Sequence, residues 1–205
     1  MNMKLNLPNQ LTVLRLLMVP VFVIVMMVSD ALWADIVGLV LFIAASLTDM
    51  LDGKIARKRN LITDFGKFLD PLADKFMVIG ALLVILYKSL NRAEPNRLFC
   101  IVFFWAVLIV IFRELAVTSM RLVVSGSSGI VIAANMLGKI KTCTQIACVI
   151  LCILEPLLAY NLEGLDFFAD YLPLSTVSTV AMAFFTLWSG ISYIRSYWKY
   201  LDPGK

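Results

Sequence analysis

Four aspartates lie at regular spacing in two neighbouring segments of the chain, and their type and spacing suit them to chemistry. Asp49 and Asp52 are three positions apart, and Asp70 and Asp74 are four apart, so each pair lies on one face of an α-helix. Two such helices joined by a short turn would direct four carboxylates toward each other. Because this repulsion must be neutralised and hard oxygen ligands suit Mg²⁺ or Mn²⁺, we expect two divalent cations that share a carboxylate.

Small residues and a cation share the helical faces of these acids. Gly53, Ala56 and Arg57 follow Asp49 at positions i+4, i+7 and i+8, and Gly66 begins a similar face on the next segment. Small side chains let a ligand reach the helix backbone, and a guanidinium binds phosphate through two hydrogen bonds. The pattern therefore predicts a metal-bound diphosphate. Close packing of membrane helices would explain the glycines alone, but not the acids in phase with them.

The elements that position these residues must lie in a membrane. The 205 residues are 61% hydrophobic with a mean hydropathy of +0.90, well above the usual soluble range of about 45 to 50% apolar. No linker or repeat divides the chain, so we expect a single domain over residues 1–205 and no nucleic-acid partner. There is no histidine, and any proton transfer must therefore use carboxylate, lysine, tyrosine or water. We expect the four cysteines to be packing residues, because all lie in apolar segments.

Apolar stretches along the chain predict an all-α membrane protein with six transmembrane helices in one bundle. The stretches are Leu16–Ser29, Ile36–Thr48, Phe76–Tyr87, Leu98–Phe112, Thr142–Leu154 and Tyr171–Ile194. Six spans place both termini on one side, and 15 of the 18 lysines and arginines then fall on that side. The excess of positive charge predicts that the termini and the aspartates face the cytoplasm.

The uncharged parts of spans two to five are short. They contain 13, 12, 15 and 13 residues, or roughly 18 to 22 Å of helix against a hydrocarbon core of about 30 Å. Each helix must therefore continue into its charged cytoplasmic end. Because lipid does not tolerate such charges, we expect a polar cavity that opens to the cytoplasm.

The aspartate pattern resembles that of a known family. Written out, it is Asp49-x2-Asp52-Gly53-x2-Ala56-Arg57-x8-Gly66-x3-Asp70-x3-Asp74, and it is similar at all eight fixed positions to the signature of the CDP-alcohol phosphatidyltransferases. The resemblance implies a six-helix membrane enzyme, usually a homodimer, that moves a phosphatidyl group from CDP-diacylglycerol to an alcohol and releases CMP.

The same resemblance implies a role for each residue of the signature. Two divalent cations, Mg²⁺ or Mn²⁺, would be held by Asp49, Asp52, Asp70 and Asp74. Asp74 would also be the general base for the acceptor hydroxyl. The CDP site would consist of Asp52, Gly53, Ala56, Arg57 and Gly66, with Arg57 at the diphosphate.

The acceptor is predicted from other residues. Cations at the cytoplasmic ends of spans four and five could bind a phosphate on the acceptor: Arg113, Arg121, Lys139 and Lys141. Alternatively, they serve only to orient the spans. Three segments of the sequence resemble bacterial phosphatidylglycerophosphate synthases: "NLPNQLTVLRLLMVP", "FRELAVTSMRL" and "IAANMLGKIKT". This resemblance implies glycerol 3-phosphate as the acceptor and the bacterial inner membrane as the location.

Alternatives to this interpretation remain open from the sequence alone. Relatives that use inositol phosphate, serine or phosphatidylglycerol share the same signature. An aspartate-rich membrane prenyltransferase would place its acids farther apart, and a cation channel or carrier would not require small residues and Arg57 in phase with them. The acids Glu155, Glu163, Asp166 and Asp170 suit an outer loop without a functional role.

Overall fold

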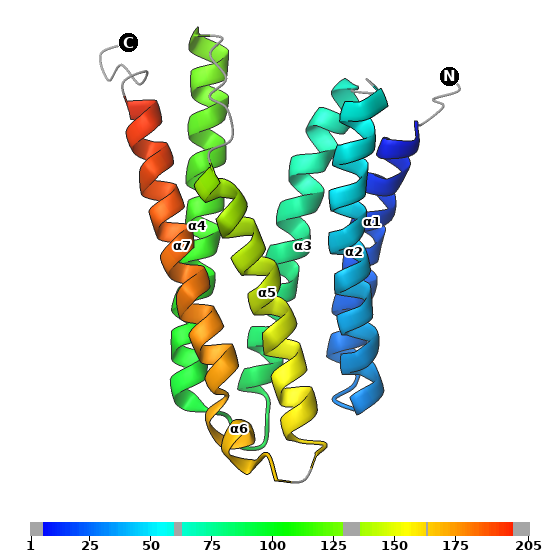
Figure 1. Cartoon of the computed structure of the whole chain (residues 1–205), viewed down its shortest axis with the longest axis vertical. Helices are drawn as coiled ribbons and strands as arrows, with labels where there is room; N and C mark the ends of the chain where they lie inside the picture. Colours follow the sequence, from blue (N-terminus) through cyan, green and yellow to red (C-terminus); the bar gives the residue numbers. More distant parts are fainter. Residues whose placement is uncertain (1–5, 60–62, 129–135, 163, 199–205) are drawn as a thin grey trace.

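The computed structural model describes residues 6–59, 63–128, 136–162 and 164–198, with the backbone alone at 52–59, 64, 67, 125, 127 and 128. Within these ranges every regular element is a helix. They are α1 (Leu7–Val28), α2 (Leu32–Arg59), α3 (Asp64–Leu90), α4 (Arg97–Ser128), α5 (Met136–Ala159), α6 (Asp166–Tyr171) and α7 (Pro173–Trp198). The long helices run up and down in one bundle, and short α6 lies at one end (Figure 1). The predicted all-α membrane bundle of six long helices is confirmed.

Helix length and hydropathy explain how the charged ends are accommodated. Among the described residues, five segments are long and apolar enough to cross a membrane: α1, Leu32–Leu51 of α2, Arg97–Val124 of α4, α5, and Asp166–Trp198. The exception is α3, whose first half carries Asp70, Asp74 and Lys75. With 28 residues, α2 is roughly 42 Å long, so its apolar part continues into the aspartate segment without a break. The short uncharged runs are therefore parts of longer helices, as predicted.

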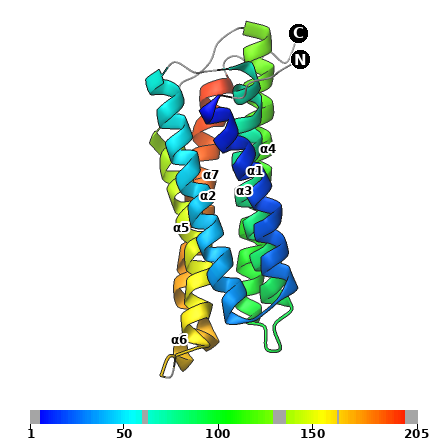
Figure 2. The same cartoon turned by 90° about the vertical axis from the view of Figure 1, so that its right-hand side faces the viewer.

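The bundle is built from two groups of three helices. In one group α1 packs against α2 and α3, and in the other α7 packs against α4 and α5. The groups share a buried core that includes Phe22, Phe42, Leu82, Phe103 and Met182. Their ribbons lie close together near α6 and diverge toward the end where α1 begins and α7 ends (Figure 1). Figure 2 shows the bundle from the side, with these two helix ends at the same end of the bundle. The aspartates lie at this diverging end.

The structure corrects the prediction that Glu155 belongs to an outer loop. Glu155 lies near the end of α5 and is only 4% exposed. Its carboxylate accepts the backbone N–H groups of Leu174 at 2.9 Å and Ser175 at 2.5 Å. These N–H groups belong to the first turn of α7, where no earlier carbonyl can accept them. Glu155 therefore caps α7 and favourably meets the positive end of its dipole.

Cysteine packing agrees with the prediction at three of the four positions. Cys100, Cys148 and Cys152 are buried, whereas Cys143 is exposed. Cys148 and Cys152 contact the hydroxyl of Thr179 on α7 at 3.7 and 3.9 Å, respectively. All four are free thiols. The prediction was wrong for Cys143, because its position on α5 faces outward.

Candidate active site

The predicted site residues lie at the end of the bundle that carries both termini. Asp49 is on α2, and Asp70 and Asp74 are one turn apart on α3. The helical backbone of α2 includes Asp52, Gly53, Ala56 and Arg57, but their side chains lie outside the described residues. Gly66 lies in the first turn of α3. The expected helical placement of the signature is confirmed, whereas the roles of all eight residues stay predictions.

A buried arginine of α1 joins the aspartates of α2 and α3. Arg15 is 0% exposed, and its Nη1 lies 2.6 Å from Oδ1 of Asp49. The same nitrogen donates a hydrogen bond to Oδ1 of Asp74. The two carboxylates keep 34% and 48% of their side-chain surface exposed, so each meets the cation on one side and remains accessible to a ligand on the other. Arg15 thereby offsets the repulsion between two acids that belong to different helices.

Two further polar residues of α1 contact α3. The Thr12 hydroxyl, 1% exposed, lies 2.7 Å from Oδ1 of Asp70 and donates to it. The Asn9 amide donates to Oγ1 of Thr63 at 2.9 Å, and Thr63 in turn accepts the backbone N–H of Gly66 at 3.1 Å as the N-cap of α3. These contacts fix both the start of α3 and the orientation of one of its aspartates.

Gly66 allows α1 to approach α3 closely. A Cβ at this position would lie 2.8 Å from Oδ1 of Asn9, which is too close for a normal contact. The close contact between α1 and α3 therefore explains why position 66 is a glycine. A part for Gly66 in the cytidine pocket stays a prediction.

The donor set suits a hard divalent cation. Asp49 and Asp74 direct oxygens from two helices to one positively charged position, that of Arg15 Nη1. Among the side chains that the structure describes, no three acidic, histidine or cysteine residues converge on a single point. Asp52, the fourth acid of the signature, is not among those side chains. Because carboxylate oxygens are the hard ligands that Mg²⁺ and Mn²⁺ prefer, these acids fit such a cation by their chemistry.

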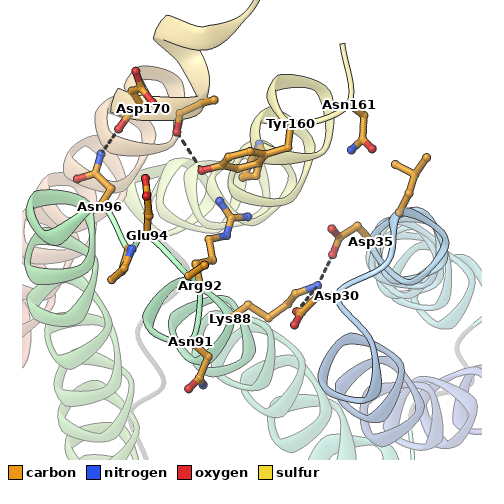
Figure 3. Close-up of a pocket in the computed structure, with 15 residues that line it drawn as sticks. Asp30, Asp35, Lys88, Asn91, Arg92, Glu94, Asn96, Tyr160, Asn161 and Asp170 are labelled. Carbon is orange, nitrogen blue, oxygen red and sulfur yellow. Dashed lines mark hydrogen bonds and ion pairs between the residues drawn. The ribbon is translucent and has the colours of Figure 1, made fainter. Parts of the chain in front are cut away.

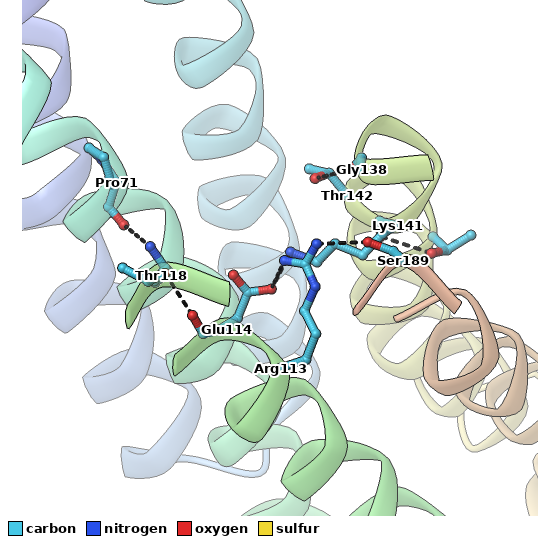
Figure 4. Close-up of polar contacts among 10 residues, drawn as sticks. Pro71, Arg113, Glu114, Thr118, Gly138, Lys141, Thr142 and Ser189 are labelled. Carbon is cyan, nitrogen blue, oxygen red and sulfur yellow. Dashed lines mark hydrogen bonds and ion pairs between the residues drawn. The ribbon is translucent and has the colours of Figure 1, made fainter. Parts of the chain in front are cut away.

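The predicted acceptor cations are only partly gathered. Arg113 of α4 and Lys141 of α5 both contact Oε1 of Glu114, and Arg113 Nη1 lies 3.0 Å from that oxygen (Figure 4). Arg113 Nη2 also donates to Oγ of Ser189 on α7 at 2.7 Å. This cluster joins three helices of the second group.

The other two predicted cations are placed differently. The guanidinium groups of Arg113 and Arg121 lie 5.6 and 5.9 Å from the ring centre of Tyr193, so Arg121 is attached to the same cluster. Lys139 is exposed and lies two positions before Lys141, about 200° around the helix. The structure therefore brings together three of the four predicted cations, while Lys139 lies on another face of α5.

A large polar cavity lies at the opposite end of the bundle. It measures about 730 Å³ and lies among the ends of α2, α3, α5 and α6 (Figure 3). Lys88 pairs there with Asp35 at 2.6 Å and Asp30 at 3.7 Å, and Arg92 stacks on Tyr160 at 4.6 Å. Lys88 is thus engaged with two acids at the start of α2, and Arg92 with an aromatic ring at the end of α5. This end lacks the in-phase acids and small residues of the signature.

Comparison with known proteins decides the family. The sequence matches the CDP-alcohol phosphatidyltransferase family over residues 5–188, nearly the whole chain. The chain belongs to this family. It is therefore a phosphatidyltransferase rather than a cation channel, carrier or prenyltransferase, and the resemblance predicted from the aspartate signature is confirmed.

Individual members of the family are similar to nearly the whole of this chain. A CDP-diacylglycerol–glycerol-3-phosphate 3-phosphatidyltransferase of Bacillus subtilis is 42% identical over 96% of this chain and 97% of its own. A phosphatidyltransferase of the same name from Rickettsia bellii is 32% identical over 95% of this chain and 97% of its own. A chloroplastic and mitochondrial member from Arabidopsis thaliana is 34% identical over 96% of this chain and 64% of its own.

Several residues that contact the predicted site residues were not predicted from the sequence. Asn9, Thr12 and Arg15 recur every three positions in an otherwise apolar first helix, and this spacing was the available signal. Glu114 is a lone acid at the end of a long apolar run, which in a membrane helix indicates a paired or functional group. Ser189 had no comparable signal, because serines are common in membrane helices.

Proposed function

We propose that this phosphatidyltransferase transfers the phosphatidyl group of CDP-diacylglycerol to sn-glycerol 3-phosphate and releases CMP. The observation that carries the proposal is the 42% identity, over 96% of the chain, to a relative named for this acceptor. The pairing of Arg113 and Lys141 supports it, because two cations at one point suit a phosphate-bearing acceptor. Serine, inositol phosphate and phosphatidylglycerol are the competing acceptors.

The reaction forms one P–O bond and breaks another. The acceptor hydroxyl attacks the phosphorus on the lipid side of the diphosphate, the bond to the CMP oxygen breaks, and the hydroxyl proton passes to a base. Asp74 is the proposed base, and its contact with Arg15 orients its carboxylate. Two divalent cations, held by Asp49, Asp52 and Asp70 with Asp74 nearby, would supply charge neutralisation at the diphosphate.

The remaining side chains orient the reactants. Arg57 would bind the diphosphate through its planar fork, and Gly53, Ala56 and Gly66 would line the cytidine pocket. Thr12 holds Asp70, and Arg15 holds Asp49 and Asp74, so the acids need little reorganisation when the substrates bind. The predicted cytoplasm-facing cavity would admit both the polar acceptor and the CDP head group.

The acceptor is tested by measuring CMP release with purified protein and CDP-diacylglycerol. Glycerol 3-phosphate should support turnover, and free glycerol, serine or inositol phosphate should not. Equal turnover with one of these alternatives would contradict the proposed acceptor while leaving the family assignment intact.

Replacing a cation of the predicted acceptor pocket should change the KM for one substrate only. We expect Lys141→Met or Arg121→Gln to raise the KM for glycerol 3-phosphate by roughly ten- to a hundredfold. This factor corresponds to the loss of one charged hydrogen bond, which contributes about 1.5 to 3 kcal/mol. The KM for CDP-diacylglycerol should barely change. Arg195→Gln is the matched control, since Arg195 is an exposed cation at the same end of the bundle. An unchanged KM in both test variants would exclude the phosphate pocket.

We also propose that the aspartate end faces the cytoplasm of a bacterial inner membrane. In a variant without the four native cysteines, a cysteine at Lys139 should react only with reagents added from the cytoplasmic side. One at Asn161, exposed at the other end, should react only from outside. The reverse pattern of labelling would overturn the orientation.

The homodimer stays a prediction, to be checked by cross-linking in the membrane.

A further inference from the structure

Glu114 is a buried acid that the proposed chemistry does not use. Its residue surface is 8% exposed, and it lies on α4 among hydrophobic neighbours such as Val110 and Val117. An uncompensated carboxylate in such a place would be strongly unfavourable. Its compensation comes from two cations on different helices, Arg113 on α4 and Lys141 on α5, which share a single oxygen, Oε1.

The surroundings of Arg113 restrict its guanidinium from several sides. Nη1 contacts Glu114, and Nη2 donates to Oγ of Ser189 at 2.7 Å. The side-chain stem is held by α7, since a Cβ at Gly190 would lie 3.0 Å from Cγ of Arg113. Glu114 itself sits on a turn where Thr118 donates to its backbone carbonyl at 2.7 Å. Figure 4 shows the ends of the Arg113 and Lys141 side chains meeting beside the Glu114 carboxylate.

The spacing of the two cations is suited to a single phosphate group. Two donors that reach one oxygen lie close enough to reach two oxygens of the same phosphate. Without the carboxylate, the two positive charges would repel each other and separate. With it, the trio keeps a net positive charge, because two cations face one anion, and it can still attract a phosphate dianion.

We propose that Glu114 is a positioning residue that sets the spacing of Arg113 and Lys141 for the phosphate of the acceptor. This inference rests on the proposed acceptor function and identifies the acceptor class as phosphomonoesters. Glu114 acts through the two cations and does not touch the reacting atoms.

The first test compares two buried glutamates. Glu114→Gln should raise the KM for glycerol 3-phosphate by roughly ten- to a hundredfold and leave the KM for CDP-diacylglycerol within about twofold. Glu114→Asp, which keeps the charge, should recover part of this loss. Glu155→Gln is the matched control, because Glu155 is equally buried but caps α7 at the far end. It should lower the melting temperature without changing either KM.

A second variant keeps the test decisive if Glu114→Gln is poorly folded. The double variant Glu114→Gln with Lys141→Met lacks one of the two cations that lose their carboxylate partner, and it should be more stable than Glu114→Gln alone. In the Lys141→Met background, Glu114→Gln should raise the KM by less than about threefold, because there is no longer a pair of cations to space.

The outcomes separate this inference from the proposed function. If Lys141→Met raises the KM for glycerol 3-phosphate but Glu114→Gln leaves it unchanged or lowers it, the positioning role is wrong and the phosphate pocket stands. The positioning role is equally wrong if the two effects multiply fully in the double variant. If Lys141→Met leaves the KM unchanged, the role of Glu114 is wrong, and if Arg121→Gln leaves it unchanged as well, the acceptor pocket also fails.

Discussion

Asp49→Asn and Asp70→Asn should each lower CMP release by roughly three orders of magnitude. A neutral amide is a poor ligand for Mg²⁺ or Mn²⁺, and charge stabilisation by a bound metal is worth several kcal/mol in the transition state. Turnover of CDP-diacylglycerol should likewise stop in EDTA and return when Mg²⁺ or Mn²⁺ is added. The measurement is the release of CMP by purified protein in detergent.

The control for this series is Asp30→Asn. Asp30 is an acid at the opposite end of the bundle whose side chain is 90% exposed, and its loss should leave turnover unchanged. Melting curves of each variant show whether a loss of turnover comes from unfolding. Normal turnover of a folded Asp49→Asn or Asp70→Asn variant would remove that aspartate from the metal site. Full activity in chelator would exclude the two-metal mechanism.

Arg15→Gln should reduce both stability and activity. Removing one partner of a buried ion pair costs about 3 to 5 kcal/mol, and the lower value applies here because Asp49 and Asp74 are partly exposed. For a chain of this size roughly 3 kcal/mol corresponds to a fall in Tm of about 6 to 12 °C. CMP release should fall more than about a hundredfold, since the two acids are no longer held together. Arg15→Lys should recover much of the Tm, but less of the activity.

Arg92→Gln provides the comparison for Arg15. Arg92 is also a partly enclosed guanidinium, but it stacks on Tyr160 at the other end of the bundle. Its replacement should lower the Tm with turnover retained. If Arg15→Gln behaved in the same way, Arg15 would be a structural residue with no part in holding the acids.

Residues within one helix could be placed from the sequence. The spacing of Asp70 and Asp74 by four, and of Asp49 and Asp52 by three, determines a shared face because the α-helix repeats every 3.6 residues. The uncharged runs predicted the long helices, and the charged ends predicted that the helices extend beyond them. The family signature was equally accessible, since all eight of its positions lie on two neighbouring helices, α2 and α3.

Contacts between distant segments depended on the tertiary structure. Arg15 meets Asp74 across 59 positions, and Arg113 meets Ser189 across 76, so no local periodicity could pair them. Helical spacing says which residues share a face, but not which face of another helix packs against it. The same limit hid the capping of α7 by Glu155. The separation of Lys139 from Lys141, in contrast, follows from their spacing by two on one helix. The helices and the candidate acids could be read from the sequence. Helix packing sets which cations and hydroxyls contact those acids, because these contacts depend on the rotation and approach of each helix in the bundle.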